Sequence, residues 1–250
     1  MVDNELEKII DLFKSGIEEN IEMAWSFGQL PKYKVIFDEY LEGFKTFCEQ
    51  QKTTIPELFA AKSLKLDYNV TDLPEALGQL TNLEHLNTTY QELEKLPESI
   101  GQLSNLKSLT CYDSKLPELP ESIGDLTSLE EIDFTMNKLS KLPMSFGMLS
   151  NLEYLNLSYN PLEELPQNLE NLKSLKGLYL TGTSLTYLPS WIASLSKLSE
   201  LDIGETKITE LPSTVKMLKN LKVIEWKGSI LTDDLKKKIE LDYPDLRIKF

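Results

Sequence analysis

The sequence predicts an α/β solenoid, and three observations support this fold class. The dipeptide Leu-Pro recurs every 23 residues, with its prolines at Pro74, Pro97, Pro120, Pro143, Pro166, Pro189 and Pro212. Columns of Leu keep the same period, including the one that begins with Leu83, Leu106 and Leu129. Residues 1–56 of the 250 lack this period. A fixed period of this length is the signature of stacked repeats, in which neighbours share one core.

Each repeat is expected to contain a short strand and an outer helical turn. Residues at alternate positions of segments such as Leu86-Asn87-Thr88 point inward, and those between them face solvent. A second inward column contains Thr88, Cys111, Phe134, Leu157, Leu180, Ile203 and Trp226, so the Cys111 thiol is predicted to be buried. Each Leu-Pro fixes φ and starts a helical or 3₁₀ turn outside. The glycines of this turn, from Gly78 to Gly147, give way to other residues later, which predicts looser outer turns in the C-terminal half.

The repeat resembles the leucine-rich repeat of the 23-residue bacterial and Ras-group type. The match is closest over Leu152-Glu153-Tyr154-Leu155-Asn156-Leu157-Ser158-Tyr159-Asn160-Pro161-Leu162, and the resemblance covers residues 57–228. It implies a right-handed horseshoe with a parallel sheet on the concave face and short helical turns outside. We count eight strand units and seven Leu-Pro copies.

Several positions depart from the family pattern. The Asn whose side chain satisfies the turn is present at Asn69, Asn137 and Asn160, whereas Ser or Thr replaces it in most other repeats. Gln91 also stands in this column, and its longer side chain is expected to replace Asn poorly. The first unit, which begins at Leu64, is one residue short, so its loop is expected to differ.

Both ends of the repeat array need a cap. Residues 1–56 carry apolar residues at helical spacing, such as Leu6, Ile9, Ile10 and Phe13, and predict a helical N-terminal cap. A separate helical recruitment module is the alternative for this segment. Residues 229–250 predict a C-terminal cap, with a helix that starts at Thr232 and a last edge strand over Leu246, Ile248 and Phe250.

Motifs that carry catalysis are missing from the sequence. It contains no Gly-rich phosphate loop, nucleophile elbow or zinc-binding His pair, and its one histidine, His85, is expected on a solvent-facing strand position. We therefore predict a protein that is not an enzyme and has no catalytic residues, metal site or cofactor. Cys48 and Cys111 lie far apart, which favours two reduced thiols in a cytoplasmic protein, or a secreted one whose upstream signal has been removed.

The solvent-facing strand positions predict a binding surface. Six of the ten tyrosines fall there, together with eight acidic residues and two lysines. Tyrosine offers a large, rigid contact area with a hydrogen-bonding tip. The predicted partner-binding residues are Tyr68, Tyr90, Tyr112, Asp113, Glu131, Asp133, Tyr154, Asn156, Tyr159, Tyr179 and Asp202.

These features predict a non-catalytic protein-interaction module that binds a partner protein or peptide of basic character. The net charge of −14 argues against nucleic acid and anionic membrane surfaces as partners. Two other interpretations remain open: a secreted or surface adhesin that binds carbohydrate or a host protein, and a hydrolase that uses Glu131, Asp133 and His85. The low Arg content beside abundant Lys favours a bacterial origin. Neither the identity of the partner nor the oligomeric state follows from the sequence.

Overall fold

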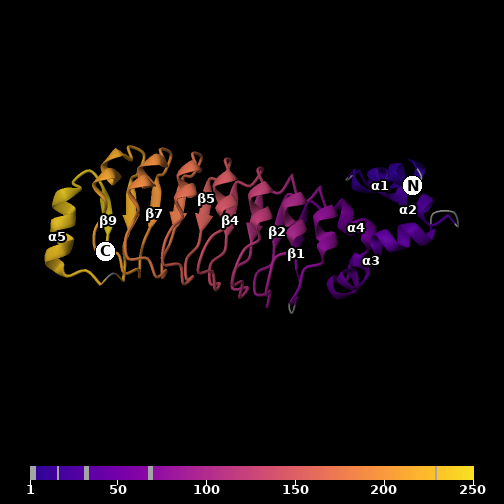
Figure 1. Cartoon of the computed structure of the whole chain (residues 1–250), viewed down its shortest axis with the longest axis horizontal. Helices are drawn as coiled ribbons and strands as arrows, with labels where there is room; N and C mark the ends of the chain where they lie inside the picture. The colour runs from indigo at the N-terminus through magenta and orange to yellow at the C-terminus, as the bar shows by residue number, and fades with distance from the viewer. Residues whose placement is uncertain (1–3, 16, 31–33, 67–69, 229) are drawn as a thin grey trace.

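The computed structural model describes residues 4–15, 17–30, 34–66, 70–228 and 230–250, which form one elongated stack (Figure 1). Within these residues a single sheet of nine parallel strands runs in chain order from β1 to β9. The strands are β1 (Ser63–Lys65), β2 (His85–Asn87), β3 (Ser108–Thr110), β4 (Glu131–Asp133), β5 (Tyr154–Asn156), β6 (Gly177–Tyr179), β7 (Glu200–Asp202), β8 (Val223–Glu225) and β9 (Arg247–Lys249). The predicted α/β solenoid is confirmed.

The strand register follows the sequence period. Ser108 pairs with Glu131 and Glu131 pairs with Tyr154, a step of 23 residues each time. The first step is one residue shorter, because Ser63 pairs with His85. The short first unit is therefore confirmed, whereas its expected loop, residues 67–69, lies outside the described residues.

The opposite side of the stack carries 3₁₀ helices of five residues each. They are η1 (Glu75–Gln79), η2 (Glu98–Gln102), η3 (Glu121–Asp125), η4 (Met144–Met148), η5 (Gln167–Asn171), η6 (Ser190–Ser194) and η7 (Ser213–Met217). Each begins directly after the proline of a Leu-Pro pair, which fixes φ near −65°.

The expectation of looser outer turns in the C-terminal half is wrong, because η5 to η7 are as long as η1 to η4. The backbone closes the turn in both halves: the Leu169 N–H donates to the Pro166 carbonyl oxygen at 3.2 Å, as the Ile100 N–H does to Pro97 at 3.0 Å. Glycine has another role in this column. A Cβ at Gly78 would lie 2.4 Å from the carbonyl oxygen of Ser99, so glycine lets neighbouring repeats approach closely there.

Both inward columns are buried and form one continuous core from Ile9 to Tyr243. Cys111 is fully buried in the second column, as predicted, and burial raises the pKa of its thiol to about 12. Trp226, the largest residue of this column, is also fully buried and packs near the Phe250 ring, with 5.9 Å between ring centroids.

Buried amides tie neighbouring turns together. The Asn160 Oδ1 accepts from the Leu139 N–H at 3.0 Å, and its Nδ2 donates to the Phe134 and Leu157 carbonyl oxygens at 2.8 and 3.0 Å. In the same column, the Thr183 hydroxyl donates to the Leu180 carbonyl oxygen at 2.7 Å.

Gln91 replaces this asparagine better than expected. Its Oε1 accepts from the Val70 N–H at 2.8 Å, which matches the bond that Asn160 accepts from the preceding repeat. Its Nε2 donates to the Thr89 carbonyl oxygen at 3.1 Å. The longer side chain fits because it is buried, with 1% exposure, and reaches both groups.

Helices cover the first repeat: α1 (Asn4–Lys14), α2 (Glu18–Gly28), α3 (Lys34–Gln51) and α4 (Ile55–Ala60). Phe13, Phe44 and Phe59 meet in their core, with ring centroids 4.4 Å apart for Phe13–Phe59 and 5.0 Å for Phe44–Phe59. This core is continuous with that of the repeats. The Asn82 amide, from the first repeat, also donates to the Lys14 carbonyl oxygen at 2.8 Å. The helices thus form the expected cap.

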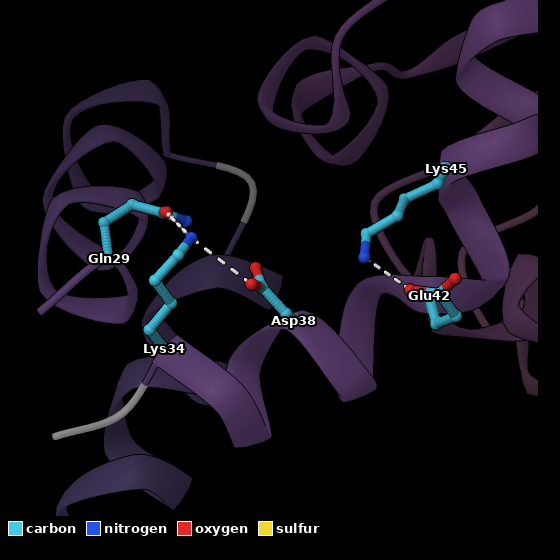
Figure 2. A network of polar contacts seen from close by, with 5 residues as sticks. All are labelled: Gln29, Lys34, Asp38, Glu42 and Lys45. Carbon is cyan, nitrogen blue, oxygen red and sulfur yellow. Dashed lines mark hydrogen bonds and ion pairs between the residues drawn. The ribbon is translucent and has the colours of Figure 1, made fainter. Parts of the chain in front are cut away.

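Polar contacts fix how α2 meets α3 (Figure 2). The Lys34 ammonium at the start of α3 donates to Gln29 Oε1, just past the end of α2, at 2.8 Å. It also lies 3.2 Å from a carboxylate oxygen of Asp38, one turn further along α3. A second ion pair joins Lys45 and Glu42 on the same helix.

The other end is closed by α5 (Asp233–Asp242) and β9. The Thr232 hydroxyl accepts from the Leu235 N–H at 3.4 Å, which confirms the predicted helix start. Ile248 in β9 pairs with Ile224 in β8, so the predicted last strand is also confirmed. The N-terminal helices and α5 lie at opposite ends of the stack (Figure 1).

Candidate binding surface on the sheet

The predicted binding residues fall on the solvent-facing side of the sheet, called here the sheet surface. It consists of the outward residues of β2 to β8 and the loop positions that follow each strand. Glu131 and Tyr154 begin their strands, whereas Asp133, Asn156, Tyr179 and Asp202 end theirs. Tyr90, Tyr112, Asp113 and Tyr159 lie in the loops just after the strands. Tyr68 lies outside the described residues.

Three of the predicted residues also shape the strand ends. Asp133 Oδ1 accepts from the Thr135 N–H at 2.9 Å, and Asn156 Oδ1 accepts from the Ser158 N–H at 3.1 Å. Asp202 Oδ1 accepts in the same way from the Gly204 N–H at 2.9 Å. These bonds turn the backbone out of the strand, so one oxygen of each side chain has a structural role.

The loop column at the edge of the surface adopts left-handed backbone in every described repeat. Its residues are Tyr90, Asp113, Met136, Tyr159, Gly182, Glu205 and Gly228, with φ from 51° to 67°. Each step is tied to the next, as in the 2.7 Å bond from the Tyr159 N–H to the Thr181 carbonyl oxygen. Glycine tolerates this conformation, whereas other residues are strained in it by about 1–2 kcal/mol. Tyr90, Met136 and Tyr159 nevertheless expose 55%, 44% and 42% of their surface.

Aromatic side chains gather near β2 and β3. The Tyr90 and Tyr112 rings meet edge to face, with 5.4 Å between centroids. The Tyr112 hydroxyl lies 3.1 Å from the Met136 sulfur of the next repeat. These contacts line up three side chains of the predicted surface along successive repeats.

A second aromatic group lies over β6, where two glycines make room for it. A Cβ at Gly177 would lie 2.8 Å from Tyr154 Cδ1 and 2.9 Å from Tyr179 Cε2. A Cβ at Gly182 would lie only 2.4 Å from Tyr159 Cδ1. The glycines therefore let the three rings settle against the backbone of the sixth repeat.

The tyrosines of this group donate hydrogen bonds to carboxylates. The Tyr179 hydroxyl donates to Glu200 at 2.5 Å, and the Tyr159 hydroxyl reaches across a whole repeat to Glu205 at 3.2 Å. Desolvation, followed by the bond to Glu205, raises the pKa of Tyr159, and desolvation followed by the bond to Glu200 raises that of Tyr179. Both phenols therefore stay protonated at neutral pH and hold the two carboxylates in place.

Lysines are paired away from the centre of the sheet surface. Lys107 and Lys62 both lie against Glu84, at 2.6 and 2.9 Å, and Lys176 lies 2.6 Å from Glu153. Glu225 on β8 pairs with Lys249 and, at 3.3 Å, with Lys227. The surface between β2 and β7 carries no Lys or Arg at its outward positions.

The groups considered for hydrolysis are not assembled. Ser108 pairs with both His85 and Glu131, so these two residues stand two strands apart, about 10 Å. Among the residues that the structure describes, no group of three His, Cys, Asp or Glu residues is placed to hold a metal ion. Cys48 and Cys111 are free and buried. Within the same ranges, no helix is long and apolar enough to span a bilayer.

Sequence comparison decides the family. The family profile described as a leucine-rich repeat region matches residues 17–144 and 136–241. The chain belongs to the leucine-rich repeat family. No characterised protein sequence matches it significantly.

Solved leucine-rich repeat structures share the fold. Internalin InlF of Listeria monocytogenes aligns with 77% of this chain and 55% of its own, with a TM-score of 0.64 and 23% identity. The chain thus spans about half the length of that protein. Internalin C2 of the same organism aligns with 70% of this chain and 73% of its own, at 0.60 and 25%. A plant peptide hormone receptor, RGFR1 in complex with RGF2, aligns with 77% of this chain and 32% of its own, at 0.62 and 25%.

The leucine-rich repeat geometry adds residues that were not among the predicted binding residues. Met136 and Glu205 share the left-handed column with Tyr90, Asp113 and Tyr159, and Glu200 receives the Tyr179 bond. The 23-residue spacing of Met136 and Glu205 from predicted members was the available signal. The glycines that admit the rings could not be recognised, because their role depends on the packing of side chains from the preceding repeat.

Proposed function

We propose that this leucine-rich repeat protein is a non-catalytic interaction module that binds a basic protein segment on its sheet surface. One observation carries the proposal: large side chains stay exposed at left-handed positions where glycine would relieve strain, as Gly182 and Gly228 do. Strain that packing does not require favours a role in binding. The proposal assigns residues 57–228 to binding, and 1–56 and 229–250 to the caps.

The class of partner follows from two further facts. The sheet surface is acidic and aromatic, and its outward positions between β2 and β7 carry no Lys or Arg, which favours a cationic partner. The similar receptor RGFR1 forms a complex with RGF2. Together they support a protein or peptide partner, as opposed to nucleic acid or a small substrate.

The test replaces Tyr112, Tyr154 and Tyr179 together by Ala and compares partners captured by the variant and the wild type. The matched control replaces Met144, Met148 and Met217, three exposed side chains on the 3₁₀ side. We expect the tyrosine variant to lose partners that the control keeps, while both show wild-type circular dichroism. A folded tyrosine variant that keeps every specific partner contradicts the proposal.

We also propose a cytoplasmic location. Two free, buried thiols suit a reducing compartment, although a secreted adhesin would have the same fold. Fractionation of the native cell with antibody detection separates these possibilities. Recovery in the surface or medium fraction, with binding on a glycan array, would support the adhesin instead.

A further inference from the structure

The acidic residues within the strands of the sheet surface have their own period. β4 carries Glu131 and Asp133, and β7 carries Glu200 and Asp202. The two intervening strands, β5 and β6, carry no charge on this face. Two anionic strands are therefore separated by two neutral, tyrosine-bearing strands.

The register makes this arrangement a straight line across the sheet. Glu131 pairs with Tyr154, Tyr154 with Gly177, and Gly177 with Glu200. The strand ends repeat it, because Asp133 pairs with Asn156, Asn156 with Tyr179, and Tyr179 with Asp202. Strand spacing puts the two anionic strands about 14 Å apart.

The interval between the anionic strands has an aromatic floor. Tyr154 is 38% exposed, and the rings of Tyr154 and Tyr179 lie over Gly177. Tyr179 is held there by its bond to Glu200. An apolar side chain can therefore contact tyrosine rings midway between the two sets of carboxylates.

The anionic strands have no cation of their own. Among the described residues, none of the four carboxylates on β4 and β7 takes part in an ion pair, in contrast to Glu225 on β8, which has two lysine partners. Asp133 and Asp202 each use one oxygen for the strand end, but Glu131 and Glu200 are exposed. Charge complementarity at this face thus requires cations from a partner.

We infer that the partner presents an extended segment with the pattern basic–x–apolar–x–basic, running across the strands from β4 to β7. Residues i, i+2 and i+4 of an extended chain face the same side, and four steps at about 3.4 Å span about 14 Å. The two cations then meet the anionic strands, and the central side chain meets Tyr154 and Tyr179. This inference rests on the proposed function and deepens it by naming the partner's pattern.

The experiment selects peptides from a random 12-residue display library on the whole protein. The expected peptides carry Lys or Arg at i and i+4 with a large apolar residue at i+2. Synthetic variants of a selected peptide with the two cations at i+2, i+4 or i+6 spacing are expected to bind best at i+4. Binding should also weaken with added salt.

Protein variants test the anionic strands separately. Glu131→Lys with Glu200→Lys is expected to weaken binding of the selected peptides about tenfold and to select acidic residues at i and i+4 instead. Glu131→Gln with Glu200→Gln covers the case in which charge reversal disturbs folding. The matched control, Glu163→Lys with Glu164→Lys, makes the same charge change at exposed residues off the sheet surface and should bind as the wild type does.

The outcomes distinguish this inference from the proposed function. Selected peptides that lack paired cations, or that bind the Glu131/Glu200 variants unchanged, overturn the basic–x–apolar–x–basic pattern. If those peptides still require Tyr112, Tyr154 and Tyr179, sheet-surface binding stands without that pattern. If no selected peptide depends on the sheet surface, both the pattern and the proposed function fail.

Discussion

Replacing the buried Asn160 by Ala tests how the repeats are held together. Its amide joins three repeats: Oδ1 accepts from Leu139 N–H, and Nδ2 donates to the carbonyl oxygens of Phe134 and Leu157. The Phe134 carbonyl keeps a second donor, the Asn137 amide at 3.0 Å. The Ala variant therefore takes the partner from two buried backbone groups, those of Leu139 and Leu157.

The magnitude follows from those two groups. A buried polar group that loses its partner costs about 1–3 kcal/mol, so Asn160→Ala is expected to lower the free energy of unfolding by about 2–6 kcal/mol. Asn160→Thr should cost less. The hydroxyl of Thr183, in the same column, donates to the carbonyl three residues before it at 2.7 Å, and the new Thr can do the same to Leu157.

Urea unfolding followed by far-ultraviolet circular dichroism measures these differences. Asn151→Ala is the matched control, because Asn151 is exposed and its amide makes one bond, to the Thr127 carbonyl oxygen at 2.8 Å. We expect the order wild type, then Asn160→Thr, then Asn160→Ala, with Asn151→Ala close to wild type. An Asn160→Ala variant within about 1 kcal/mol of the Asn151→Ala control would refute the reasoning that the buried amide joins the repeats.

Three further predictions concern conformation, reactivity and pH. Gly182→Ala should destabilise the fold by about 1–2 kcal/mol in thermal unfolding, because φ is 67° there, and less so if Tyr159→Ala removes the ring that the new Cβ meets; an equal cost in both backgrounds would exclude the ring clash. Cys111 and Cys48 should not react with Ellman's reagent at pH 8 until urea unfolds the protein, since burial raises both thiol pKa values, that of Cys111 to about 12; rapid reaction of the folded protein would contradict this. Hydrogen bonds and ion pairs with Lys107 and Lys62 lower the pKa of Glu84 from 4.5 to about 2, so their stabilising effect is complete above pH 4.5 and is lost as pH falls toward 2. The urea midpoint should fall over that range, and Glu84→Gln should flatten the fall; an unchanged pH profile would count against it.

Much of the fold was predictable because the repeat converts sequence position into spatial position. Once Leu86 and Leu109 are equivalent, their strands pair in parallel, and the buried place of Cys111 follows from its column. The candidate site was predictable to the same extent, since outward positions alternate with inward ones. The looser outer turns were predicted wrongly because the glycine column governs how closely repeats approach, whereas proline and backbone bonds form the turn.

The sequence by itself determined the repeat, its strand register, and which residues face solvent, because each of these depends on the local period of 23 residues. Only the tertiary structure decided how side chains of different repeats meet. The bond from Tyr159 to Glu205 spans 46 residues, and it exists because Gly182 leaves room for the ring between them. The left-handed column also emerges only there, since hydrogen bonds between neighbouring repeats hold backbone that the local sequence does not favour.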